Sequence, residues 1–148
     1  MKISRTIFKP SDLALLGDTV EGGAHDLRLA RQSSNSPSFT WTDPHGVVIC
    51  CGGHISLWEG MAVTWAVVSP ALTMSPYKRE FIELFYLNHT SMAKIFGIRR
   101  FQADVRADFA AGKRLVEMLG YKYECDMEDY GPDGETMSQY RWLAKEHL

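Results

Sequence analysis

The chain has 148 residues, 45% of them hydrophobic and 23% charged, with a formal net charge of −2 at pH 7. This length and composition predict one globular domain over residues 1–148 with its own hydrophobic core. The balanced charge gives no electrostatic basis for nucleic-acid binding, and no run of about 18 apolar residues predicts a membrane helix.

Cysteine and histidine usage bears on compartment and metal chemistry. The three cysteines, Cys50, Cys51 and Cys125, show no disulfide pattern and favour a reducing compartment. The five histidines are scattered without ligand spacing, so no metal site is expected. Residues 1–10 carry charges with no apolar stretch behind them, so we expect no signal peptide and a cytoplasmic protein.

The N-terminal third alternates short elements with turns. A first strand is predicted over residues 3–8, followed by a short helix with Ser11 as its N-cap. Gly22 and Gly23 break that segment, and a second short helix is predicted over residues 24–32.

The middle of the chain is rich in predicted strands, which cover residues 39–42, 47–56 and 61–69. Gly52 and Gly53 interrupt the second of these strands, which indicates a bulge or a close backbone approach. The third strand is apolar on both faces, with Trp65 among its side chains. Such a strand is expected in the middle of a sheet covered by helices.

In the C-terminal half, Ser75 and Pro76 predict a helix start, and the apolar period continues to Gly97. Further elements are predicted as a strand at 100–105, a helix at 109–119 and a hairpin of strands at 121–127 and 137–143. The predicted order is β-α-α-β-β-β-α-β-α-β-β. This order describes an α/β (α+β) fold with a mixed central sheet of about seven strands and about four flanking helices.

This order of elements resembles the GCN5-related N-acetyltransferase (GNAT) superfamily over essentially the whole chain. Val68-Ser69-Pro70 resembles the V-x-P at the end of the family's fourth strand, and Gly120-Tyr121 resembles the G-F that closes its last conserved segment. The chain is also similar to GNAT-like proteins of tailed bacteriophages, through W-E-G at 58–60, V-R-A-D-F-x-A-G at 105–112 and Y-G-P-D-G at 130–134. Some of those proteins are associated with virion assembly.

The resemblance implies acetyl-coenzyme A (acetyl-CoA) as the cofactor. In the family, pantetheine pairs with the edge of the fourth strand, which here falls on Val67, Val68 and Ser69.

The family's loop Q/R-x-x-G-x-G/A holds the pyrophosphate through backbone N–H groups. Its Arg position falls on Thr73 and its glycines on Pro76 and Lys78, and proline has no N–H. Lys78 and Arg79 could supply charge to a phosphate, although solvation also explains such a basic pair. We therefore predict weak or absent acetyl-CoA binding.

Acyl transfer to an amine needs a base and often an acid. The family's fourth-strand Glu has no counterpart here, and its helical Tyr and Asn positions fall on Val116 and Phe109. The remaining catalytic candidates are Glu59 in a hairpin turn, His54 on a strand and Tyr130. Each also has an ordinary explanation, which is solvation for Glu59, a structural or exposed position for His54 and packing for Tyr130.

Two functions therefore stay open. The first is a phage-type GNAT-fold protein with a degenerate acetyl-CoA site, acting as an interaction or virion assembly component with a protein partner or a second copy of itself. The second is an active acetyl-CoA-dependent N-acyltransferase that modifies an amine on a protein or small molecule. The altered loop favours the first. An exposed partner-binding patch is expected among the aromatic residues of the last hairpin, namely Tyr121, Tyr123, Tyr130, Tyr140 and Trp142.

Overall fold

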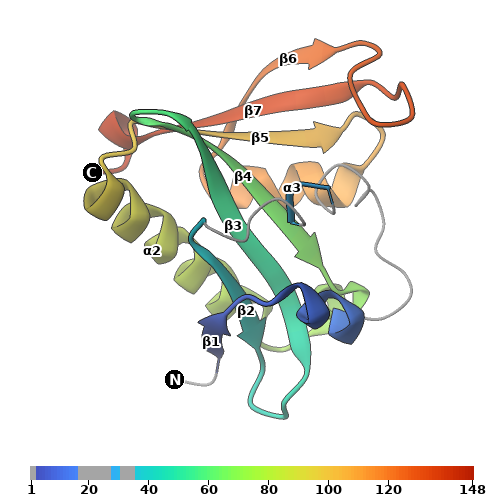
Figure 1. Ribbon diagram of the computed structural model, residues 1–148. Coiled ribbons are helices and arrows are strands. Elements are labelled where there is room, and N and C mark those ends of the chain that lie inside the picture. Colours follow the sequence, from blue (N-terminus) through green and yellow to red (C-terminus); the bar gives the residue numbers. More distant parts are fainter. Residues whose placement is uncertain (1–2, 17–27, 31–35) are drawn as a thin grey trace. The chain divides into compact units, whose positions relative to one another are not determined.

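The computed structural model describes residues 3–16, 28–30 and 36–148 (Figure 1). The chain forms two compact units. The first comprises Met1–Ile55 with Trp65–Phe81, and the second comprises Ser56–Thr64 with Ile82–Leu148.

The strands form one seven-stranded mixed sheet in the described residues, in the order β1-β2-β3-β4-β5-β7-β6. They are β1 (Ser4–Ile7), β2 (Ser38–Thr42), β3 (Val48–Trp58), β4 (Met61–Val68), β5 (Arg100–Arg106), β6 (Lys122–Met127) and β7 (Met137–Leu143). The helices with described bounds are α2 (Lys78–Phe96) and α3 (Ala110–Met118), with the 3-10 helices η1 (Pro10–Leu16), η2 (Pro70–Met74) and η3 (Ala144–Glu146), and residues 28–30 are helical as well. The predicted fold class is confirmed. Most of the helix predicted over residues 24–32 lies outside the described residues.

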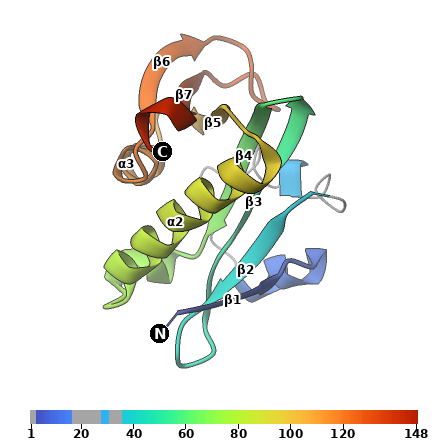
Figure 2. The same cartoon turned by 90° about the vertical axis from the view of Figure 1, so that its left-hand side faces the viewer.

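In the first unit, β1 pairs antiparallel with β2, and β2 pairs antiparallel with β3 (Figure 2). Gly53 of β3 lies opposite Ser38, the first residue of β2. A Cβ atom on Gly53 would lie 2.4 Å from the Cβ atom of Ser38, so only glycine fits at position 53. This confirms the close approach expected from the Gly-Gly pair. The register shift between these strands lies elsewhere, between Trp41 and Thr42.

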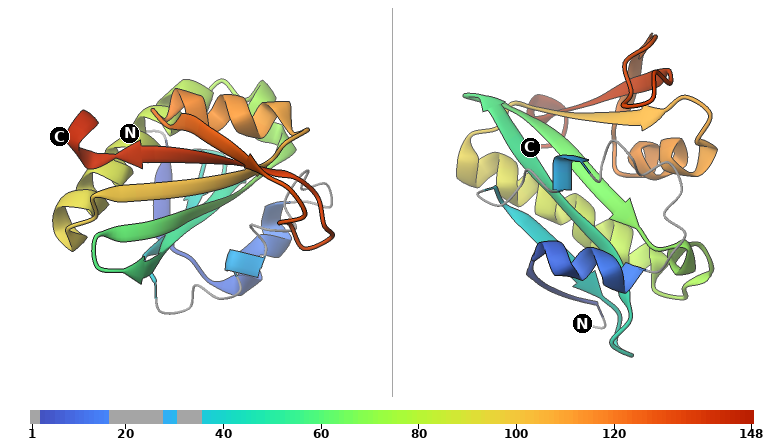
Figure 3. Two further views of the ribbon diagram at one scale, coloured as in Figure 1. Left: turned by 90° about the horizontal axis from the view of Figure 1, so that it is seen from above. Right: turned by 45° about the vertical axis from the view of Figure 1, so that its right-hand side comes forward.

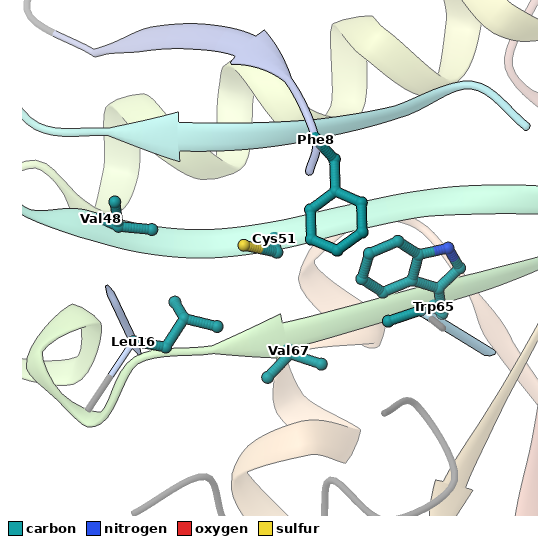
Figure 4. Close-up of a cluster of buried hydrophobic side chains, with 7 residues drawn as sticks. Phe8, Leu16, Val48, Cys51, Trp65 and Val67 are labelled. Carbon is teal, nitrogen blue, oxygen red and sulfur yellow. The ribbon is translucent and has the colours of Figure 1, made fainter. Parts of the chain in front are cut away.

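The hydrophobic core of the first unit gathers around Trp65, whose side chain is 1% exposed (Figure 4). The ring of Phe8 meets Trp65 edge-on with centroids 5.1 Å apart. The cluster also contains Leu16, Ala30, Val48, Cys51 and Val67. The predicted burial of Trp65 is therefore confirmed.

A buried carboxylate fixes η1 in the first unit. Asp12 accepts hydrogen bonds from the Lys9 N–H at 3.0 Å and from the Thr40 hydroxyl at 2.8 Å. The N-cap prediction for Ser11 is wrong, because η1 already begins at Pro10 and Asp12 is the residue that bonds back to the chain before it. Asp12 thus joins η1 to β2.

In the second unit, residues 61–63 of β4 pair in parallel with residues 100–102 of β5. The antiparallel partner β7 covers the whole of β5, and β6 pairs with the other side of β7 (Figure 3). Phe101, Ala103 and Val105 are buried, as the alternation predicted. The ring of His89 on α2 packs against Phe101 at 5.0 Å, so this face of the strands lies under α2.

Candidate functional site

The end of β4 carries the backbone edge predicted to meet pantetheine. The side chain of Val67 belongs to the hydrophobic core, and Val68 is half-buried. The N–H of Ser69 donates to the Ile49 carbonyl at 2.9 Å, and its hydroxyl accepts from the Ala71 N–H at 3.2 Å. The polar groups of Ser69 that these bonds use therefore serve β3 and η2.

The segment at the family's pyrophosphate-loop position, residues 70–78, uses its own backbone donors. Five N–H groups in it donate to Ser69, Leu72 or Ser75, and they belong to Ala71, Leu72, Ser75, Tyr77 and Lys78. Pro70 and Pro76 have no N–H. The other two residues of this segment that have an N–H group, Thr73 and Met74, lie within the 3-10 helix η2.

The basic pair sits in the first turn of α2, which begins at Lys78 rather than at Pro76. Lys78 is half-buried and Arg79 is exposed. Glu80 follows at once, and its carboxylate accepts from the Ile3 N–H at 3.1 Å. The first turn of α2 thus carries two cationic side chains and one carboxylate.

Residues 70–78 differ from the loop that holds the pyrophosphate in the family that the sequence resembles. Such a loop offers several free N–H groups and glycines that let a phosphate approach the backbone. Here the N–H groups are mostly engaged, and prolines stand at two positions. Lys78 and Arg79 are the remaining candidates for phosphate contact.

His54 lies on β3 and is 4% exposed. Burial lowers the pKa of its imidazole to about 4, so the ring is neutral at pH 7. Its backbone N–H donates to the Pro37 carbonyl at 3.1 Å. A buried imidazole with such a low pKa is a weak base, which supports a structural role for His54.

Glu59 occupies the turn between β3 and β4 and is exposed. The next residue, Gly60, has a φ of +84° and its carbonyl accepts from the N–H groups of Arg99 and Arg100, at 2.8 and 3.1 Å. The Arg99 guanidinium donates to the Glu59 carbonyl at 3.3 Å. These contacts hold the turn through its backbone.

Tyr130 lies after β6 and belongs to a group of hydrogen-bonded polar side chains that the sequence did not predict. Its hydroxyl donates to Asp104 Oδ2 at 3.3 Å, and Gln102 Nε2 donates to Asp104 Oδ1 at 3.2 Å. Asp104 is only 5% exposed, whereas Tyr130 is 47% exposed. Burial, and then the neighbouring Asp104, raise the pKa of Tyr130. We call Gln102, Asp104 and Tyr130 the Asp104 cluster.

Strand alternation places the Asp104 cluster on the polar face of β5. Because Phe101, Ala103 and Val105 take one face, Gln102 and Asp104 take the other. Next to the cluster, Arg100 donates to Gln102 Oε1 at 3.2 Å and forms an ion pair with Glu124 on β6. A buried carboxylate beside a phenol and an amide is an arrangement that can bind a cationic amine.

The sequence prediction missed Asp104 because the resemblance implies a catalytic carboxylate on the fourth strand, whereas Asp104 lies on β5. The available signal was an acidic residue between Ala103 and Val105 in an alternating strand, where burial is expected on one face. Its pairing with Tyr130 has no local signal, since 26 residues separate the two side chains.

A second buried polar group joins three elements of the second unit. His89 Nδ1 lies 2.9 Å from the Phe85 carbonyl, and His89 Nε2 lies 2.7 Å from the Tyr121 hydroxyl, which bonds to Thr64 Oγ1 at 2.8 Å. Burial raises the pKa of Tyr121 well above its ordinary value, so the phenol keeps its proton. All three side chains are buried, which makes this group a structural link between α2, β4 and the start of β6.

Asp108 directly precedes the start of α3 but does not cap the helix. Phe109 holds the cap position without a side-chain bond, and Asp108 forms an ion pair with Arg106 instead. A Cβ atom on Gly112 would lie 2.6 Å from the Phe109 ring, so Gly112 makes room for the aromatic side chain that stands at the family's Asn position.

Three further observations limit the chemistry of the described residues. They contain no group of three or more His, Cys, Asp or Glu side chains placed to hold a metal ion. Cys50 and Cys51 are buried free thiols, and Cys125 is an exposed one. No helix in the described part of the chain has the length and apolar character needed to cross a bilayer.

Comparison with known proteins identifies the fold. No family model matches the chain, and no curated protein matches it. Among solved structures, a GNAT-family acetyltransferase from Bacillus anthracis superposes with a TM-score of 0.74 at 13% identity, covering 98% of this chain and 96% of the other.

Other structures agree. A mutant of spermidine N-acetyltransferase SpeG from Vibrio cholerae gives a TM-score of 0.73 at 12% identity, with coverage of 99% and 96%. The Salmonella typhimurium protein yncA, solved with its cofactor acetyl-CoA, gives 0.66 at 17% identity, with coverage of 100% and 97%. The chain therefore has the GNAT fold, and sequence identities this low establish the fold alone.

Proposed function

We propose that this chain is a phage-type GNAT-fold protein whose acetyl-CoA site is degenerate, and that it acts as an interaction or virion assembly component. The observation that carries the proposal is the engagement of five N–H groups within residues 70–78, together with the two prolines. A segment built in this way favours its own 3-10 turn over a bound diphosphate.

The positions that serve catalysis in the family add support. Val116 and Phe109 stand where the family has Tyr and Asn, and neither side chain can donate or accept a proton. Thr64 in the middle of β4 is a buried hydroxyl already bonded to Tyr121. The phage assignment rests on the W-E-G, V-R-A-D-F-x-A-G and Y-G-P-D-G motifs, and it implies the cytoplasm of a bacterial host or a virion as the location.

The test combines a partner search with an activity assay. Affinity purification of the tagged full chain from its native source should recover a larger assembly, such as a phage particle, in stoichiometric amounts. Incubation with acetyl-CoA and a panel of amines should release no coenzyme A above the rate without protein. Acetyl transfer by a chain that recovers no assembly would contradict the proposal.

The Asp104 cluster favours a second candidate, an acetyl-CoA-dependent N-acyltransferase. A buried carboxylate is suited to orient the amine and to accept the proton that it loses on attack, and a phenol that keeps its proton at neutral pH is suited to protonate the leaving thiolate. If transfer is observed, Tyr130→Phe should lower kcat and Asp104→Asn should raise KM for the amine. Unchanged constants in both variants would place the chemistry elsewhere.

A further inference from the structure

The tip of the β3–β4 hairpin exposes two large apolar side chains next to each other. Leu57 is 52% exposed and Trp58 is 63% exposed, and Ser56 and Glu59 on either side are exposed as well. Tryptophan is highly buried on average, and it is among the residue types that contribute most at protein interfaces. An exposed Trp58 beside an exposed Leu57 therefore suits a protein contact.

The hairpin tip is held firmly. The Gly60 carbonyl accepts from both Arg99 and Arg100, and the Arg99 guanidinium lies against the turn and bonds to the Glu59 carbonyl. A Cβ atom on Gly60 would lie 2.4 Å from Arg99 Nη1, so the turn and this side chain are closely packed. A surface fixed in this way loses little conformational entropy on binding.

The C-terminal end of α2 extends this apolar surface. The helix ends beside the hairpin tip in two perpendicular views (Figures 1 and 2). Ile95 and Phe96 there are 67% and 52% exposed. We define the tip patch as Leu57, Trp58, Ile95 and Phe96. Exposed Glu59, Lys94 and Arg99 lie next to these residues in the sequence or in space. An apolar centre with a charged rim is the usual composition of an interface.

We propose that the tip patch binds a second copy of this chain across a two-fold axis. The charges argue for a self-complementary contact, because the negative Glu59 and the positive Arg99 lie beside each other at the same turn. A two-fold axis near them would bring Glu59 against the partner subunit's Arg99, and Arg99 against the partner subunit's Glu59. A partner of one charge sign would be repelled by one of the two.

The net charge of −2 adds little repulsion between copies. This inference names a partner for the interaction role proposed above and rests on that role.

Sedimentation equilibrium of the full chain over a range of concentrations tests the proposal. A dimer of the 16.7 kDa chain should form, and Trp58→Ser should raise its dissociation constant at least about tenfold. Met118→Ser is the matched control, since Met118 is 47% exposed on α3 and lies outside the tip patch. It should leave the constant unchanged.

A charge exchange gives a second, independent test. Glu59→Arg and Arg99→Glu chains should each associate more weakly than the original chain. A mixture of the two should associate again, because every cross-axis contact then joins opposite charges. Circular dichroism confirms that each variant is folded before it is used.

Two outcomes overturn the proposal, namely a monomer at every concentration and a dimer insensitive to Trp58→Ser. A monomer that transfers no acetyl group overturns only the tip-patch dimer and leaves the interaction role standing. If the chain forms a dimer through the tip patch and also transfers acetyl groups, the dimer proposal is supported and the proposed function is contradicted.

Discussion

His89 Nε2 lies 2.7 Å from the Tyr121 hydroxyl, which bonds in turn to Thr64 Oγ1 at 2.8 Å. The Phe85 carbonyl only accepts, so His89 Nδ1 carries a proton in that bond. The Tyr121 hydroxyl donates to Thr64 Oγ1, and its oxygen also lies within hydrogen-bond distance of His89 Nε2. Every member of the group therefore has a partner.

Tyr121→Phe should lower the free energy of unfolding by about 1–3 kcal/mol, because it leaves buried polar atoms of His89 and Thr64 without their shared partner. Urea unfolding followed by circular dichroism measures the change. Tyr123→Phe is the matched control, because Tyr123 is 54% exposed, and it should change stability by less than about 0.5 kcal/mol. Equal effects of the two substitutions would contradict the buried role of Tyr121.

Most of the fold follows from local patterns in the sequence. The β7 bounds match the prediction, and each of the other strands differs by at most two residues at either end. Alternation located the buried Phe101, Ala103 and Val105, since burial on one face is a property of the strand itself. The start of α2 was placed two residues early, because Ser75 and Pro76 form a separate turn before Lys78.

The candidate site was harder to predict, because its groups come together through strand pairing. Asp104 and Tyr130 are far apart in sequence, and β5, β7 and the turn after β6 bring them together. His89 likewise finds Tyr121 across 32 residues. Glu59 and His54 were chosen for their places in a hairpin turn and on a strand; Glu59 is exposed in that turn and His54 is buried on β3.

Trp65→Ala should destabilise the protein by about 3–5 kcal/mol, because the 1% exposed indole fills the core of the first unit beside Phe8. Thermal and urea unfolding measure the loss. Trp58→Ala removes the same side chain from a 63% exposed position and should leave the monomer's stability nearly unchanged. An unchanged melting temperature for Trp65→Ala would refute the core assignment.

Stability should fall as the pH drops from about 6.5 towards about 4, through His54. The folded-state pKa of His54 is lowered to about 4 from 6.5, so in this window the unfolded chain binds more protons than the folded chain. The full difference corresponds to about 3 kcal/mol, reached only below the folded pKa.

Urea unfolding at pH 7, 5.5 and 4.5 tests this dependence, with His54→Gln as the variant that lacks the titrating ring. His45→Gln is the control, because His45 is exposed in the turn before β3. The His45 variant should keep the slope of stability against pH, and the His54 variant should flatten it. An equally steep slope without His54 would assign the effect to other groups.

Acetyl-CoA should bind weakly or not at all in isothermal titration calorimetry, because residues 70–78 engage their own N–H groups and Pro70 and Pro76 have none. Any residual affinity should depend on the two cations at the start of α2, so Lys78→Ala with Arg79→Ala should reduce it. The control is the same Lys-Arg pair on α3, Lys113→Ala with Arg114→Ala, which should have no effect. Micromolar or tighter binding would contradict the degenerate site, and an equal effect of both pairs would indicate attraction by overall charge rather than a phosphate contact at α2.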